Sequence, residues 1–217
     1  MTRMMKGIFV VVVLGVLFQI GHFFEHAFQW GVWLFGDRSK PWMSVVADWL
    51  AMTAGQIVYP MPDICTDEKG WMAKQMLYGM EVLHLVGNTI FLVTIGLLLA
   101  YFASNHTPYY KRMGENPTRK QTRHYLKWAL AIEGFHLYEH IMLTVTVFTL
   151  GKPVGFSTLF GGTAFFPKEY AVGYRVSWHF FMNFIPTIFV MKALMPHVKE
   201  WMAWRPDLGT CECRIRH

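Results

Sequence analysis

Histidine and glutamate recur in this sequence at spacings that place their side chains on one helix face. Residues 22–26 read HFFEH and residues 136–140 read HLYEH, so both follow the pattern H-x-x-E-H. Side chains three and four positions apart lie on the same side of an α-helix. Imidazole and carboxylate groups in that arrangement are typical of metal sites inside helical bundles. The two patterns therefore predict metal-binding helix faces.

Two further pairs and one single histidine complete the candidate site. Glu81 precedes His84, and Glu133 precedes His136, by the same three positions. The predicted metal ligands are His22, His26, Glu81, His84, Glu133, His136, His140 and His179. A ligand histidine usually donates its second N–H to a carboxylate or a carbonyl. Glu25 and Glu139 are therefore predicted as catalytic residues that orient ligands or carry protons.

The ligand types narrow the choice of metal. Imidazole suits copper, iron and zinc, and carboxylates shift the preference towards iron, manganese or zinc. Three histidines per metal would favour copper or zinc, whereas a mixed histidine and glutamate set would favour non-haem iron. We predict a mononuclear or dinuclear transition-metal site, with copper or iron ahead of zinc.

Four apolar stretches must position these residues, at about 7–35, 76–103, 124–150 and 172–195. Each is long enough to cross a bilayer, which needs about 20 mostly apolar residues. The whole chain is 53% hydrophobic and only 16% charged, against about 25% charged residues in soluble domains. We predict one all-α integral membrane domain over 1–217, a four-helix transmembrane bundle. The first stretch is interpreted as a retained span, since it is long and no small-x-small cleavage pattern follows it.

The distribution of Lys and Arg predicts the orientation. Residues 1–7, the predicted inner loop 104–123 and the tail 196–217 hold eleven of them, whereas the predicted outer loops 36–75 and 151–171 hold six. An excess of basic residues marks the cytoplasmic side. Both termini are therefore predicted to be cytoplasmic in a multi-pass protein of the cell (inner) membrane. Within the first outer loop, an apolar segment near 42–59 predicts an interfacial helix, and the Gly-rich second outer loop is expected to fold back over the bundle.

The polar positions also indicate an internal repeat. GHFFEHAFQ in the first span resembles FHLYEHIML in the third, and HLVGNTIFLV in the second resembles HFFMNFIPTIFV in the fourth. This alignment pairs His84 with His179, Asn88 with Asn183, and the two H-x-x-E-H patterns with each other. Two helical hairpins repeated in the same orientation predict a pseudo-two-fold axis along the membrane normal.

The copies differ at their acidic positions. Glu81 aligns with Val176, Glu133 aligns with Gln19, and Arg175 has no basic counterpart in the second span. Loss of symmetry at charged positions suggests that the two half-sites have different tasks. Arg175 is interpreted either as a surface-directed side chain or as the partner of a carboxylate or an anionic group.

Charged groups inside a bilayer are costly and by default indicate function. A metal held in lipid predicts an oxidoreductase or monooxygenase, or a subunit of one, that acts on O2 or on a small apolar or lipid-soluble substrate. The expected partners are membrane lipids, with quinone or a redox protein, further membrane subunits or a homo-oligomer as additional candidates. Nucleic acid is not expected, because the basic residues lie between long apolar runs instead of on a polar surface.

Three alternatives remain open at this stage. Histidines on four spans resemble b-type cytochrome membrane subunits, which implies haem b and electron transfer with quinone. Intramembrane histidine and glutamate also occur in metal-ion or proton transporters, and a non-catalytic accessory subunit of a larger complex is the third alternative. Cys65 is expected to form no intrachain disulfide, and Cys211 and Cys213 form a Cys-x-Cys pair in the tail.

Overall fold

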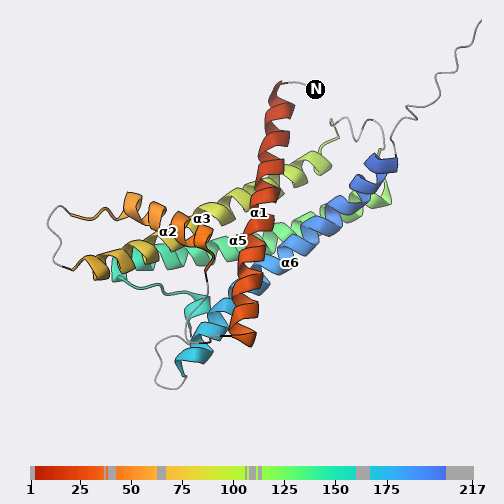
Figure 1. Cartoon of the computed structure of the whole chain (residues 1–217). Helices are drawn as coiled ribbons and strands as arrows, with labels where there is room; N and C mark the ends of the chain where they lie inside the picture. Colours follow the sequence, from red (N-terminus) through yellow and green to blue (C-terminus); the bar gives the residue numbers. More distant parts are fainter. Residues whose placement is uncertain are drawn as a thin grey trace, which may run out of the picture.

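The computed structural model describes residues 3–36, 38, 43–62, 67–105, 107, 111, 114–159 and 167–203, and the chain is all-helical over them. The long helices are α1 (Arg3–Phe35), α3 (Glu68–Ala103), α5 (Pro117–Leu150) and α6 (Lys168–Ala203) (Figure 1). A shorter helix, α2 (Val45–Val58), and a 3-10 turn, η1 (Phe156–Thr158), lie between them. Each apolar stretch of the sequence thus lies within one long helix. Cys65, Cys211 and Cys213 lie outside the described residues.

Three of the long helices are long and apolar enough to cross a membrane: α1 over Val10–Phe35, α3 over its full length, and α6 over Glu169–Lys199. The fourth, α5, has a similar length but is not in this set. Its mean hydropathy is lowered by polar side chains, several of which are fully buried, as Thr122, Glu133 and His136 are. These findings support membrane association of an all-helical chain.

The long helices pack around a continuous apolar core. Helix α1 packs against α3 and α6, and α5 packs against the same two helices. The core contains Phe91, Ile95 and Leu98 of α3, Leu126 of α5 and Val190 of α6. Between helices in a membrane, close van der Waals packing of such side chains holds the helices together, because lipid is as apolar as the core. Figure 1 shows α1 crossing the other helices steeply, with α2 beside the first part of α3.

Small residues allow α2 to lie close to α3. A Cβ atom added to Gly79 would lie 1.8 Å from the carbonyl oxygen of Ala51, and one added to Gly55 would lie 1.9 Å from that of Gln75. The two backbones therefore touch, and only glycine fits at both positions. The apolar segment near 42–59 is thus a helix, begun at Ser44, whose hydroxyl accepts a hydrogen bond from the Ala47 amide at 3.1 Å.

Arg119 joins the end of α3 to the start of α5. It is completely buried, and its guanidinium donates to the carbonyl oxygens of Phe102 (2.7 Å), Ala103 (3.1 Å) and Ser104 (3.1 Å). The last carbonyls of a helix have no partner within it, so a cation there satisfies them. One of the basic residues of the predicted inner loop therefore has a structural role between two helices, in addition to its contribution to the charge balance.

The described part of the second predicted outer loop folds back on the helices, as the sequence suggested. Helix α5 ends at Leu150 and is capped by Gly151, which has a positive φ of 69°. Val154 then bonds back to Thr146, since the Val154 amide donates to the threonine hydroxyl at 2.8 Å. The turn η1 packs on α6 and buries Ser157. This loop segment covers the region of α5 that carries the second H-x-x-E-H pattern.

Candidate metal centre

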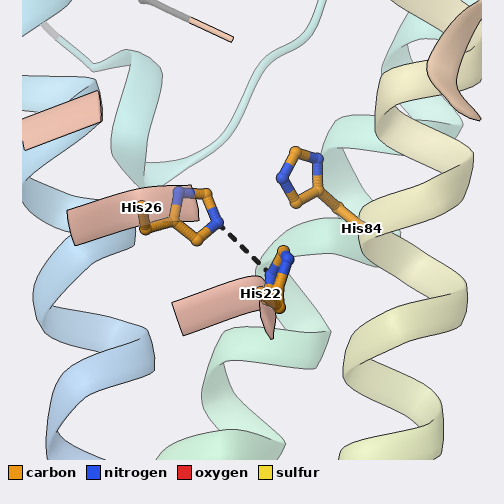
Figure 2. Close-up of side chains that lie close together, drawn as sticks. All are labelled: His22, His26 and His84. Carbon is orange, nitrogen blue, oxygen red and sulfur yellow. Dashed lines mark hydrogen bonds between the residues drawn. The ribbon is translucent and has the colours of Figure 1, made fainter. Parts of the chain in front are cut away.

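Three histidines from two helices form a first triad: His22 and His26 of α1 and His84 of α3. One nitrogen atom from each lies within 4.8 Å of those of the other two. The Nε2 atoms of His22 and His26 are 3.3 Å apart. Figure 2 shows these two nitrogens joined by a hydrogen bond between rings that meet edge to face, with the His84 ring beside them on α3. Three imidazole nitrogens so close together form the type of donor set that binds a transition metal.

In the first triad, hydrogen bonds at Nδ1 hold the rings of His26 and His84 on the side away from Nε2. The Nδ1 atom of His26 donates to the side-chain carbonyl oxygen of Gln29 at 3.0 Å, and that of His84 donates to the backbone carbonyl of Met80 at 2.9 Å. Such bonds fix the ring orientation and leave Nε2 with a free lone pair. Both rings therefore present a ligand atom towards the middle of the triad.

A second triad has the same composition: His136 and His140 of α5 and His179 of α6. Its ligand nitrogens also lie within 4.8 Å of one another, and the Nε2 atoms of His136 and His140 are 3.1 Å apart. The Nδ1 atom of His179 donates to the carbonyl of Arg175 at 2.8 Å. All three rings are buried, His136 and His140 completely so. This triad is more enclosed than the first, in which only His26 is fully buried.

The two triads adjoin, so that six imidazoles form one cluster. The His84 and His140 rings stack with centroids 5.0 Å apart and planes at 10°, and the His26 and His179 rings stack at 5.7 Å and 25°. Helices α1, α3, α5 and α6 thus each contribute histidine to a single cluster.

Glu81 and Glu133 lie behind the second triad and belong to neither group of three. An Oε2 atom of Glu133 is 3.7 Å from Nδ1 of His136, and one of Glu81 is 3.9 Å from Nδ1 of His140. Both carboxylates are completely buried. Arg175 donates to Oε1 of Glu81 at 2.5 Å. Of the two interpretations of Arg175, the structure supports the partner of a carboxylate.

Glu25 and Glu139, predicted as catalytic, bind the segments that follow their helices. The Glu25 carboxylate accepts a hydrogen bond from the Ser44 backbone amide at 2.8 Å. The Glu139 carboxylate accepts one from the Ser157 amide at 2.6 Å and another from the Trp178 indole. Each glutamate therefore anchors a predicted outer loop next to a triad, and neither is among the six clustered nitrogen donors.

Several polar partners of the cluster were not predicted from the sequence. Gln29 follows His26 by three positions, a spacing that could have indicated it as a hydrogen-bond partner. Gln19 donates to Asn183 at 3.1 Å and to Thr187 at 3.3 Å, and Asn183 in turn donates to the carbonyl of His179 at 2.8 Å. The sequence had singled out Asn183 as the repeat counterpart of Asn88, but its bond to Gln19 was not predicted, because that bond joins α1 to α6 across the fold.

Residues 1–205 match a family described as a family of unknown function, DUF6008, and the chain belongs to that family. No curated protein and no solved structure matches the chain. The function proposed below therefore rests on the side-chain geometry.

Proposed function

We propose that the six histidines of this DUF6008 protein bind two transition-metal ions, one in each triad, and that the pair serves redox chemistry in a membrane. The observation that supports this most strongly is that each triad brings three imidazole nitrogens within 4.8 Å of one another. Buried polar groups normally satisfy one another with hydrogen bonds. The paired Nε2 atoms, 3.3 Å apart in the first triad and 3.1 Å in the second, satisfy one another by hydrogen bonding in the absence of metal, and the same atoms would serve as ligands to a metal ion bound between them.

The proposal includes a four-span bundle in which α5 is the fourth span. The polar residues that lower the hydropathy of α5 do not face lipid, since Glu133, His136, Glu139 and His140 are each completely buried. The side chains that α5 exposes include Phe135, Ile141, Val145 and Phe148. A helix with an apolar outer surface and a polar inner face suits a membrane protein with a buried site. The excess of Lys and Arg then argues for both termini in the cytoplasm.

The contacts within the cluster support a pseudo-two-fold repeat. Exchange of α1 with α5 and of α3 with α6 converts the His84–His140 stack into the His179–His26 stack. It also relates two hydrogen bonds. Nδ1 of His84 donates to the carbonyl of Met80, and Nδ1 of His179 donates to the carbonyl of Arg175, each four residues earlier. Hydrogen bonds and ring stacks are more specific than apolar similarity between helices. We infer that the two hairpins are copies of one ancestral unit.

The glutamates at the matched positions 25 and 139 support the same repeat. Each accepts a backbone N–H from the segment that follows its helix, Ser44 in one case and Ser157 in the other. These segments differ in length and sequence, so the shared bond is not a consequence of local similarity. In this proposal, Glu25 and Glu139 position the loops that close the site, and a role in proton transfer remains a prediction.

Copper is the metal that the ligand set favours. Each triad offers three imidazoles, and Glu81 and Glu133 lie on the Nδ1 side of the rings instead of beside Nε2. A set of three histidines suits copper or zinc, whereas iron sites generally include carboxylate ligands. Zinc does not change its oxidation state, so a redox role selects copper. Iron would require Glu81 or Glu133 to turn towards the metal.

A copper pair in an apolar bundle is suited to an oxidoreductase or monooxygenase that acts on O2 or on a small lipid-soluble substrate. Exclusion of water strengthens electrostatic interactions and protects reactive intermediates. The alternative to copper is haem b, which histidines from four helices could bind as axial ligands. The close stacking of the rings argues against it, because a macrocycle would have to separate rings whose centroids lie 5.0–5.7 Å apart.

Metal analysis of the purified protein together with an absorption spectrum tests the proposal. We expect about two copper ions per chain after reconstitution with Cu(I) and no Soret band. A matched variant, His124→Ala, removes a histidine of α5 that lies outside both triads and should leave the copper content unchanged. Less than one equivalent of any metal would contradict the proposal, and a Soret band would establish haem instead.

A further inference from the structure

A cavity of about 180 Å³ lies beside the histidine cluster, between α1, α3, α6 and the residue Met43 just before α2. Its walls come from segments far apart in the sequence, and they are His26, Gln29, Met43, Met80, His84, Val172, Arg175, Val176 and His179. For comparison, a cavity of about 150 Å³ in a protein core can hold benzene. The space is therefore large enough for a small organic molecule.

This cavity reaches both triads. His26 and His84 belong to the first triad and His179 to the second, and all three line the cavity. The His26 and His179 rings stack on one another there. A molecule in the cavity would thus lie next to both proposed metal positions at once, which is the geometry that a substrate of a metal pair requires.

The walls define the chemistry of the occupant. Met43, Met80, Val172 and Val176 provide an apolar surface. Arg175 uses one nitrogen to bind Glu81 at 2.5 Å, so the cation is already neutralised by a carboxylate. A second anion would gain little from such a pair, whereas the other N–H groups of the guanidinium suit a neutral oxygen acceptor. Gln29 adds a second polar group at the same wall.

We propose that this cavity binds a small neutral organic molecule with an apolar body and one hydrogen-bond-accepting oxygen, held by Arg175 beside the histidine cluster. The part of this inference that places the molecule next to metal rests on the proposed function. The binding itself depends only on the cavity and on the chemistry of its walls. Arg175 would then have two roles, because it also holds Glu81 behind His140.

The test uses cyclohexanone as the probe and the full-length protein in detergent. Saturation-transfer NMR of the probe measures binding to the metal-free protein, and the visible spectrum of the Cu(II)-loaded protein reports whether the probe lies near metal. Val176→Phe fills the cavity from a wall that is buried, and Val172→Phe fills it from a second position. The control, Val86→Phe, adds the same ring to an exposed position on α3.

We expect saturable binding to the metal-free wild type and to the control. Both cavity-filling variants should bind at least about tenfold more weakly, a free-energy change of about 1.4 kcal/mol. In the copper-loaded wild type, the probe should shift the visible spectrum. Equal binding by the wild type and by both filled variants would overturn the proposal, as would no binding to the wild type.

The two proposals fail separately. Suppose that the wild type binds the probe and both filled variants bind it more weakly, but the protein takes up no metal. The cavity is then a binding site and the proposed function is wrong. If copper binds in both triads and the probe does not bind, the metal centre stands and the cavity proposal is wrong.

Discussion

The two triads use equivalent helix positions and differ in the groups behind their rings. In the first triad, Nδ1 of His26 meets the neutral amide of Gln29 at 3.0 Å. In the second, buried carboxylates of Glu133 and Glu81 lie near Nδ1 of His136 and His140, and because Arg175 neutralises Glu81, Glu133 is the uncompensated charge. If the hairpins are copies, as proposed, the duplication has kept the histidines and changed the groups around them.

The substitution at one pair of positions explains much of this difference. In the proposed repeat, Gln19 of α1 is the counterpart of Glu133 of α5, and it bridges α1 to Asn183 and Thr187 of α6. Glu133 is completely buried, and neither of its oxygens has a hydrogen-bond partner among the described residues. An isolated buried carboxylate is costly. The cost would be offset by a metal cation bound through the neighbouring His136.

A carboxylate behind an imidazole makes that imidazole a stronger donor and favours a more highly charged metal. The second triad should therefore stabilise Cu(II), and the first, with an amide behind it, should favour Cu(I). Two ions of unequal character in one cluster would be suited to electron transfer between them.

Removal of a triad should abolish its metal site. The double substitution His136→Ala and His140→Ala is expected to remove about one of two copper ions per chain, because one remaining histidine cannot hold the metal. The matched double substitution of His22 and His26 should remove the other ion. Elemental analysis of the two variants checks this. Retention of both ions in both variants would place the metal elsewhere.

Neutralisation of Glu133 should weaken the second triad selectively. For Glu133→Gln, which keeps the side-chain size, the Cu(II) affinity of the second triad is expected to fall about 10–100-fold. Competition with a chelator in the background of the His22/His26 double variant measures it. An unchanged affinity would mean that the carboxylate does not act through His136.

The reciprocal change should make the triads more alike. Gln29→Glu places a carboxylate at the end of the Nδ1 bond of His26 and should raise the Cu(II) affinity of the first triad by about tenfold. The same chelator competition applies, now in the background of the His136/His140 double variant. A decrease would show that burial of the new charge outweighs its effect on the ring.

The loop anchors should differ in strength as the triads differ in burial. Glu139 is completely buried and accepts bonds from Ser157 and Trp178, whereas Glu25 is only partly buried and accepts one from Ser44. A hydrogen bond to a charged group contributes about 1.5–3 kcal/mol. Glu139→Gln should therefore lower the free energy of unfolding by more than Glu25→Gln. Thermal unfolding of the two metal-free variants provides the comparison, and the reverse order would contradict it.

The smallest effect is expected at the connection between the two hairpins, away from both triads. Hydrogen bonding to Arg123 holds the pKa of Glu115 below its usual value of 4.5. A lowered folded-state pKa means that this stabilisation is complete above pH 4.5 and is lost as the pH falls through the folded-state pKa. Thermal unfolding measured from pH 6 downwards should show a shallower decline in Glu115→Gln than in the wild type. If the stability of the wild type and of Glu115→Gln falls in parallel with pH, the Glu115 carboxylate contributes no stabilisation.

The sequence predicted the helices well, since an apolar run of membrane length can adopt little else. Residues 124–150 were predicted as a span from their length and apolar content, and they lie within helix α5, but polar residues lower its hydropathy and it is not among the three helices apolar enough to cross a membrane. The helix boundaries differed, as α3 begins at Glu68 instead of near 76 and α5 at Pro117 instead of near 124. Hydropathy locates apolar segments, whereas caps at Asp67 and Asn116 decide where helices begin.

Within the site, spacing alone identified the histidines that share a helix face, because the pitch of an α-helix relates residues 22 to 26 and 136 to 140 in any fold. Spacing could not show that His84 joins the first pair and His179 the second. Nor could it show that Glu81 of α3 lies behind His140 of α5, or that Arg175 of α6 forms an ion pair with Glu81. Those relations depend on which helices are neighbours and how they are rotated. Packing of whole side-chain surfaces fixes both, and no spacing within one helix contains that information.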